Sequence, residues 1–243
     1  MKLELVRIAG EGRQLAGLHY IPDRTPRPTA LVLAHGFTSG KHSMDTLAGY
    51  LAGRGYEALT FDLVGHKLGA TGGAMERTEQ AAENMRDALN WMREQTQAER
   101  IVLIGHSMGA AAALQTAAWE QRLRHLPPVA GLACICMGLD PARGFDNQIG
   151  QAMLAQRSDY VAGAPPLELL TGLNRLLESA SQLGDLPTLL IAAKQDVLLP
   201  VERVEALAAR IGANAAMMVL ETTHLEAPDK ARGSIANWLE HLA

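Results

Sequence analysis

Short apolar runs alternate with longer stretches of helical periodicity along most of the 243 residues. Runs rich in aliphatic and β-branched residues are typical of strands buried on both faces of a sheet. Parallel strands need long crossover connections, which place helices on both faces. The pattern therefore predicts an α/β fold with an open, doubly wound, mostly parallel sheet. The predicted strands are residues 30–34, 56–61, 101–104, 129–136, 188–192 and 216–220, and the predicted helices cover about 41–53, 78–96, 107–120, 201–211 and 228–242.

The first twenty residues have a different pattern. Residues 3–8 and 14–20 alternate apolar and polar positions more regularly than the later runs, and the segment Glu11-Gly12-Arg13 lies between them. Alternation of this kind is typical of strands with one buried face, and a short polar segment between two such runs indicates a turn. We therefore expect an antiparallel hairpin that leads into the sheet.

The strand rhythm stops between Leu139 and Gly184, where leucines recur at helical spacing. We interpret residues 139–183 as a small helical lid insertion, and residues 1–138 and 184–243 as the core domain. Pro165-Pro166 inside the insertion favours the start of a helix. Ligands of open α/β sheets bind at the carboxyl ends of the strands, so the insertion is expected to cover that edge. The simpler alternative is a pair of helices that only covers the sheet.

Composition excludes several classes of protein. The chain is 48% hydrophobic, and its 22 basic and 26 acidic residues give a net charge of −4, without a basic cluster suited to nucleic acid. The longest apolar run, from Val129 to Leu139, is too short for a membrane span of about 20 residues. The amino-terminal residues lack the apolar segment of a signal peptide. Cys134 and Cys136, the two cysteines, stand too close on one predicted strand face for a disulfide. We expect a cytoplasmic protein of undetermined oligomeric state.

The sequence Gly105-His106-Ser107-Met108-Gly109 stands between a predicted strand and a helix rich in small residues. This G-x-S-x-G pattern in this context predicts a sharp turn that raises the Ser107 hydroxyl above the sheet, with glycines on either side to avoid clashes. Ser107 is thus the candidate nucleophile.

With this turn the chain resembles the α/β-hydrolase superfamily, over almost its whole length apart from the insertion. The segment His35-Gly36-Phe37-Thr38 follows an apolar run, as the oxyanion segment of that family does. The resemblance implies that the backbone N–H groups of Phe37 and Met108 point at a developing oxyanion, with the Phe37 ring facing the substrate.

The resemblance also implies a catalytic acid and base. Asp196 follows a predicted strand at the place of the family's acid, and His224 follows the next one, in the family's chain order of Ser, Asp and His. In such a triad His224 takes the serine proton and Asp196 orients the imidazole. Asp185 is a competing acid at the wrong end of its strand. Glu221 and Asp229 also compete, but both lie very close to His224 in sequence.

The remaining histidines receive lesser roles. The resemblance suggests that His35 and His106 brace the turns beside the site through ring hydrogen bonds. A metal site built from His35, His42 and His66 lacks the spacing of known ligand motifs, so we expect neither a metal nor a cofactor.

Residues 62–69 resemble the D-x-x-G-H-G-x-S loop of the same family, with two departures. Lys67 replaces a glycine and Gly69 replaces the serine. We expect a different turn here, in which Lys67 either places a cation near the mouth of the site or is simply solvated.

A serine at the turn excludes the haloalkane dehalogenase and epoxide hydrolase branches, which use aspartate there. The motifs are similar to those of short-lid esterases, including cinnamoyl and feruloyl esterases, monoacylglycerol lipases and serine aminopeptidase-like members. We therefore expect a carboxylesterase whose substrate is a small-molecule ester with an apolar or aryl acyl group. A C–C bond hydrolase, a perhydrolase and a non-catalytic small-molecule-binding protein remain alternatives.

The insertion is expected to line the site with apolar side chains. These are Met153, Leu154, Tyr160, Leu167, Leu170 and Leu173. Among them Met153, Leu170 and Leu173 are expected to be the principal substrate contacts, together with Phe37.

Overall fold

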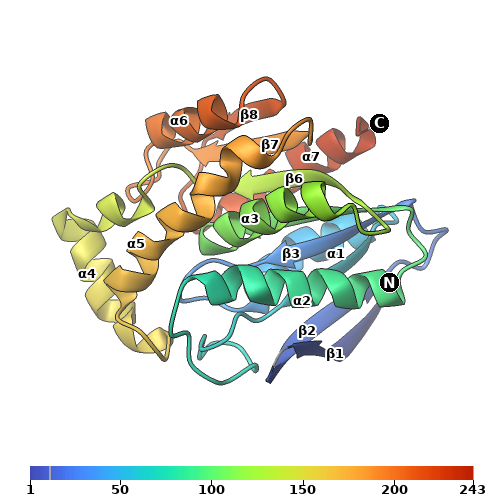
Figure 1. Cartoon of the computed structure of the whole chain (residues 1–243), viewed down its shortest axis with the longest axis horizontal. Coiled ribbons are helices and arrows are strands. Elements are labelled where there is room, and N and C mark those ends of the chain that lie inside the picture. The colour runs from blue at the N-terminus through green and yellow to red at the C-terminus, as the bar shows by residue number, and fades with distance from the viewer. Residues whose placement is uncertain (11, 243) are drawn as a thin grey trace.

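The computed structural model describes residues 1–10 and 12–242 and contains an eight-stranded sheet in the order β1-β2-β4-β3-β5-β6-β7-β8. The pairs β1–β2 and β2–β4 are antiparallel, and the other neighbours are parallel. This is the predicted fold class (Figure 1). The strands are β1 (Lys2–Gly10), β2 (Arg13–Ile21), β3 (Thr29–Ala34), β4 (Glu57–Phe61), β5 (Arg100–His106), β6 (Val129–Ile135), β7 (Thr188–Ala193) and β8 (Ala215–Leu220).

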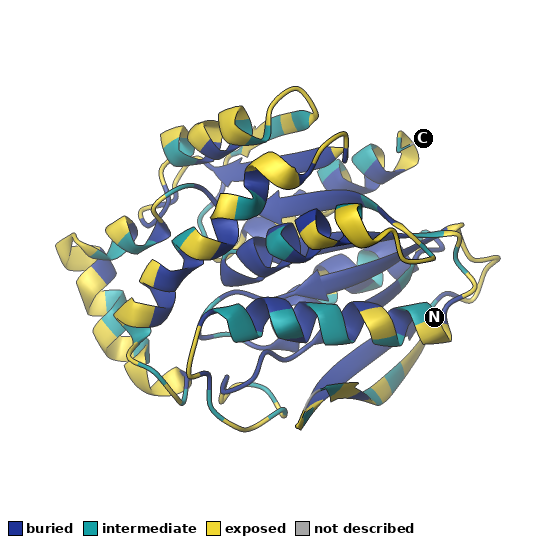
Figure 2. Ribbon diagram, in the orientation of Figure 1, coloured by how far each residue is buried: buried dark blue, intermediate teal, exposed yellow. Residues whose placement is uncertain are grey.

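Helices cover both faces of the sheet. The α-helices are α1 (Asp45–Ala52), α2 (Glu79–Gln95), α3 (Met108–Leu123), α4 (Gln148–Arg157), α5 (Pro166–Leu177), α6 (Val201–Ile211) and α7 (Ala227–Glu240), and the 3-10 turns are η1 (Lys41–Met44), η2 (Pro141–Phe145), η3 (Ser158–Tyr160) and η4 (Glu178–Gln182). Apolar side chains of α2, α3, α5 and α6 share one core cluster, whereas those of α1 and α7 share the other. Alternate residues of each central strand enter the two clusters, so the sheet is buried on both sides (Figure 2).

The predicted hairpin forms from β1 and β2, and its turn residue Glu11 lies outside the described residues. Two predicted elements differ from the structure. The helix at 41–53 divides into η1 and α1. The strand predicted to reach Cys136 stops at Ile135, because Cys136 has a positive φ of 50°. Cys134 and Cys136 therefore belong to different core clusters rather than to one strand face, and both are free thiols.

The interval between β6 and β7 is helical, as predicted, and α5 begins at Pro166. It also contacts the loop after β4 through single bridges, His66 with Val161 and Met75 with Gly163. At Gly163, φ is +124° and a Cβ would lie 2.1 Å from the Met75 carbonyl oxygen, so only glycine fits this contact. These two bridges connect the helical segment to the loop that follows the carboxyl end of β4.

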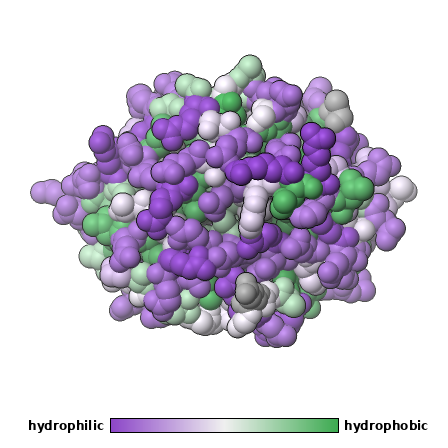
Figure 3. All heavy atoms as spheres, in the orientation of Figure 1, coloured by the Kyte–Doolittle hydropathy of each residue, from purple (hydrophilic) through white to green (hydrophobic). Residues whose placement is uncertain are grey.

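No helix in the described ranges has the length and apolar content needed to cross a membrane. On the face drawn in Figure 3, hydrophilic residues predominate and hydrophobic residues gather only in small groups.

A buried ion pair anchors the loop after β4. The fully buried Asp62 carboxylate accepts hydrogen bonds from the Lys41 ammonium, the Lys41 backbone and the Ala70 backbone, each at 2.7 Å. Burial by itself raises the pKa of Asp62, but the Lys41 contacts outweigh it and hold that pKa below its usual value. A Cβ at Gly69 would lie 2.3 Å from the Asp62 carboxyl carbon, so a residue other than glycine would require this loop to shift.

We predict that Lys41→Met lowers the free energy of unfolding by about 3–5 kcal/mol, because it leaves the Asp62 charge buried without its partner. Urea denaturation measures the change. Lys2→Met, which removes an exposed lysine paired with Glu4, is the control and should cost less than about 1 kcal/mol. An equal, small loss in both variants would contradict the role given to Lys41.

Candidate active site

Ser107 lies on the turn between β5 and α3, with φ 50° and ψ −120°. A residue other than glycine rarely adopts a positive φ, so the surrounding packing must hold this turn in place. The packing is close: a Cβ at Gly105 would lie 2.3 Å from the Gly109 carbonyl, and one at Gly109 would lie 2.4 Å from the Ala34 carbonyl oxygen. The two glycines thus let α3 approach the sheet, and the turn carries Ser107 to the carboxyl edge of the strands, as predicted.

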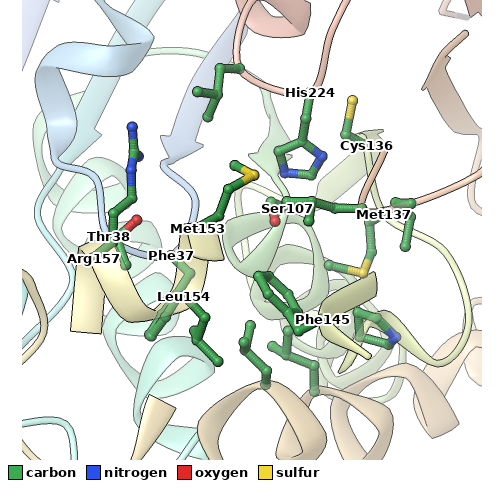
Figure 4. A pocket seen from close by; sticks show the side chains of 16 residues that line it. Phe37, Thr38, Ser107, Cys136, Met137, Phe145, Met153, Leu154, Arg157 and His224 are labelled. Carbon is green, nitrogen blue, oxygen red and sulfur yellow. The ribbon is translucent and has the colours of Figure 1, made fainter. Parts of the chain in front are cut away.

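His224 and Asp196 lie together beside this turn. The His224 Nδ1–H donates to Asp196 Oδ2 at 2.6 Å, while Asp196 Oδ1 accepts from the backbone N–H groups of Leu198 and Leu199 at 2.9 Å. The Asp196 side chain is fully buried, and the His224 side chain is 13% exposed. With Nδ1 occupied as a donor, Nε2 of the neutral ring remains as an acceptor. Figure 4 shows the His224 ring next to the Ser107 side chain.

The backbone N–H groups of Phe37 and Met108 are both without a hydrogen-bond acceptor among the described residues. Met108 is the first residue of α3, so its N–H belongs to the partly positive amino end of a helix. Phe37 precedes Thr38, which has a positive φ of 60°, and the Phe37 ring lines the pocket over Ser107. The arrangement leaves two donors free near the serine.

His35 and His106 form the ring hydrogen bonds expected of bracing residues. His35 Nδ1–H donates to the Gly36 carbonyl at 2.8 Å, and its Nε2 accepts from the Leu63 N–H at 3.0 Å. His106 Nε2–H donates to the His224 carbonyl at 2.9 Å. Burial lowers the pKa of His35 to about 4 and that of His106 to about 3, so both rings are neutral near pH 7.

A pocket opens over Ser107 between the sheet edge and the helical segment (Figure 4). Its walls come from the Phe37 segment, η2, α4, α5 and the loops after β7 and β8. Most of the lining is apolar. The lining residues are Phe37, Thr38, Ser107, Cys136, Met137, Pro141, Phe145, Met153, Leu154, Arg157, Leu170, Leu173, Leu198, Leu199, His224 and Leu225.

The structure brings most of the predicted lining residues together. Phe37, Met153, Leu170 and Leu173 all line the pocket, and Leu154 does so as well. Two expectations were wrong: Tyr160 and Leu167 do not line it and are 38% and 50% exposed. Leu167 lies on the exposed side of α5, because helical spacing alone does not say which face turns inward, and Tyr160 lies in η3, outside the regular helices.

Several lining residues were not predicted from the sequence, and Arg157 is the most distinctive of them. Lys67, the cation expected either near the mouth of the site or in solvent, is exposed and does not line the pocket. Arg157 lines it instead, from the last residue of α4. No sequence motif marks this arginine, because its position depends on how α4 docks. Phe145, at the end of η2, and Cys136, directly after β6, also line the pocket without a sequence motif that marks them.

One group of side chains has the composition of a metal site. Among the described residues, only His106, Cys136 and His224 bring three such ligand atoms within 4.8 Å of one another. Two of the rings already form hydrogen bonds, from His224 to Asp196 and from His106 to the His224 carbonyl. Burial, followed by the nearby Asp196 carboxylate, raises the pKa of the Cys136 thiol well above its ordinary value. The donor set therefore does not favour a metal ion.

A mostly parallel sheet that raises a serine on the turn before a central helix defines the class of α/β-hydrolases. Within that class, residues 25–165 match the family model described as serine aminopeptidase, S33. This match covers more than half of the chain, which therefore belongs to this family of hydrolases. No curated protein matches the sequence.

Solved structures of esterases share the fold over the whole chain. An esterase from Pyrococcus furiosus is 20% identical with a TM-score of 0.78, and the match covers 99% of this chain and 91% of that one. A thermostable carboxyl esterase from Bacillus coagulans is 16% identical with a TM-score of 0.75 and coverages of 100% and 99%. An esterase domain from Rhodothermus marinus is 22% identical with a TM-score of 0.69 and 98% coverage of both chains. At these identities the likeness concerns the fold.

We predict that the protein loses stability as the pH falls below about 6.5, where histidines of an unfolded chain take up protons. Burial lowers the folded-state pKa of His35 to about 4 and those of His66 and His106 to about 3. Between these values and 6.5 the unfolded chain binds more protons, so the contribution is complete above pH 6.5 and declines toward acid.

His66→Gln isolates one of the three groups. Between pH 4 and 6 it should reduce the slope of unfolding free energy against pH by up to about 1.4 kcal/mol per unit. Urea denaturation at several pH values measures both slopes. Identical slopes for the two proteins would contradict the assignment of a buried, neutral His66.

Proposed function

We propose that the protein is a serine hydrolase that cleaves carboxylic esters of apolar or aryl acyl groups through an acyl-enzyme, with Ser107, His224 and Asp196 as its triad. The observation that carries the proposal is the 2.6 Å hydrogen bond between His224 and Asp196, placed beside a strained serine turn in one apolar pocket. A structural serine would not need an imidazole oriented by a buried carboxylate next to it.

In the first half of the proposed reaction, His224 Nε2 accepts the hydroxyl proton of Ser107 while Oγ attacks the ester carbonyl carbon. The negative charge that develops on the carbonyl oxygen is stabilised by the N–H groups of Phe37 and Met108, which have no other acceptor among the described residues. Collapse of the tetrahedral intermediate breaks the bond to the alcohol oxygen. That oxygen leaves with the proton from His224.

In the second half, His224 takes a proton from water, and the hydroxide so formed attacks the acyl-enzyme carbonyl. The same two N–H groups hold the oxyanion, and the proton returns to Ser107 Oγ as the acid leaves. Asp196 stabilises the imidazolium in both steps without becoming protonated itself. Its own position is supported by the backbone N–H groups of Leu198 and Leu199.

The charge of the pocket favours an ester over a peptide with a free amino terminus. No acidic side chain is among the lining residues within the described part of the chain, and the one lining side chain of fixed charge, Arg157, is positive. A cation beside the site repels the ammonium group that an aminopeptidase must bind. The apolar walls suit an acyl chain or aryl ring.

We propose that residues 139–183 act as the lid of this site. Support comes from η2, α4 and α5, which supply Phe145, Met153, Leu154, Leu170 and Leu173 to the pocket.

We also propose that the protein is located in the cytoplasm. Cys134 and Cys136 are buried free thiols, which supports a reducing compartment.

We predict that Ser107→Ala lowers kcat for p-nitrophenyl esters by about 10⁶-fold, because the triad loses its nucleophile. A fluorophosphonate should label the wild type and fail to label this variant. Circular dichroism establishes that the variant is folded, and Ser181→Ala, which changes an exposed serine of η4, is the matched control. Substantial turnover by folded Ser107→Ala would overturn the mechanism, and a wild type that is neither labelled nor active would favour a binding protein.

We predict that Met153→Ala shifts acyl-chain preference, because Met153 lies on α4 with its side chain in the pocket (Figure 4). Each methylene removed from an apolar pocket is worth about 1–3 kcal/mol of discrimination, so the kcat/KM ratio of octanoate to acetate esters should change by at least about fivefold. Leu167→Ala, an exposed position of α5, should leave the ratio unchanged. Equal ratios in all three proteins would make the insertion a structural cover only.

A further inference from the structure

Arg157 is a charged side chain in an otherwise apolar pocket. Among the described lining residues it alone carries a fixed charge, and it is half-buried at the end of α4. A guanidinium that leaves water for such surroundings requires a compensating anion or a set of acceptors. Whether the Arg157 guanidinium already has an ion-pair or hydrogen-bond partner within the protein therefore decides whether it is available to a ligand.

The other arginines of the same insertion have carboxylate partners, and Arg157 does not. Arg143 lies 4.0 Å from Asp140, and Arg175 donates to Glu79 at 2.7 Å. Within residues 1–10 and 12–242 no acidic group lies within ion-pair distance of the Arg157 guanidinium, and none of the guanidinium N–H groups donates a hydrogen bond. Its neighbour is the Tyr160 ring, with 6.0 Å between the guanidinium carbon and the ring centroid. The guanidinium is thus available to a ligand.

The position of Arg157 separates two parts of the site. In Figure 4 it lies beside Thr38, at the end of the pocket opposite Phe145 and Met137. A second, adjoining hollow shares Phe37, Ser107, Arg157, His224 and Leu225 with the apolar pocket, and its further lining residues are Gly36, Ser39, Ser43, His106 and Pro228. A substrate carbonyl at Ser107 would therefore have the apolar pocket on one side and, on the other, a hollow in which Arg157 is the one fixed charge among the described lining residues.

We propose that Arg157 selects esters whose alcohol portion carries an anion, a carboxylate or a phosphate. This inference rests on the proposed ester hydrolysis at Ser107. The acyl group occupies the apolar pocket, and the leaving alcohol lies in the second hollow, where the guanidinium binds its anion. The planar fork of arginine donates two parallel hydrogen bonds to either oxyanion, and apolar neighbours strengthen the pairing by excluding water.

Two matched aryl substrates test the proposal. The butanoyl ester of 4-hydroxybenzoate carries the anion on its leaving group, and the butanoyl ester of 4-hydroxybenzamide has a neutral amide in the same place. The amide withdraws electrons more strongly, so chemistry alone favours the neutral ester. A charged hydrogen bond is worth a factor of about 10 to 100, and we expect kcat/KM to favour the carboxylate by that factor, mainly through KM. Added salt should reduce the preference.

Variants at position 157 assign the preference to this residue. Arg157→Gln should bring the carboxylate-to-amide ratio of kcat/KM to about one or below, and Arg157→Lys should retain part of it. Arg143→Gln removes an exposed arginine of the same insertion, outside the pocket, and should leave both activity and ratio at their wild-type values. Thermal melting of each variant separates a loss of stability at the end of α4 from a loss of anion binding.

Two further pairs of ester substrates test which anion is preferred and whether it must lie on the alcohol or the acyl side of the ester. Butanoylglycerol with and without a phosphate on its third carbon tests the phosphate, and monophenyl succinate against phenyl butanoate places the charge on the acyl side. Preference for the anion on the alcohol side supports the proposal. A wild-type ratio near one in both alcohol-side pairs, a ratio unaffected by Arg157→Gln, or preference for monophenyl succinate would overturn it. Absence of hydrolysis of every ester would instead overturn the proposed function.

Discussion

The close contact between the first turn of α3 and the carboxyl ends of β3 and β5 is the constraint on which the site depends. At Gly105 and Gly109 the backbones approach so closely that a methyl group would overlap carbonyl atoms of the neighbouring element. This contact holds Ser107 at a positive φ and directs the Met108 N–H outward at the amino end of a helix. The same packing therefore positions both the proposed nucleophile and one of the two proposed oxyanion donors.

Buried polar groups beneath the site keep the surrounding loops in place. Asp62 binds Lys41 and the Ala70 backbone, which connects the loop after β4 to η1 beside the oxyanion segment. His35 and His106 remain neutral and use their ring nitrogens to hold backbone atoms near Phe37 and His224. Because each of these contacts is made before a substrate arrives, the donors need little reorganisation during a reaction.

The helical segment between β6 and β7 gives the site its chemical character. It contributes both apolar side chains and the guanidinium of Arg157 to the lining of the pocket. The model of the family to which the chain belongs is described as serine aminopeptidase. An aminopeptidase must bind an ammonium group, yet the one side chain of fixed charge among the described lining residues of this pocket, Arg157, is positive. The proposed substrate preference therefore rests on the charge of the insertion and not on the fold of the core, which unrelated activities can share.

The sequence by itself determined the α/β architecture, the G-x-S-x-G turn at Ser107, the amino-terminal hairpin and the helical character of the insertion, because each depends on local periodicity or turn chemistry. Its pairing of Asp196 with His224 came from family resemblance, and the structure places the two in hydrogen-bond contact. The sequence did not predict which side chains of the insertion enter the pocket: Tyr160 and Leu167 are exposed, whereas Arg157 lines the pocket. Those orientations depend on contacts between segments far apart in the chain, such as Gly163 with Met75, which only the tertiary structure decides.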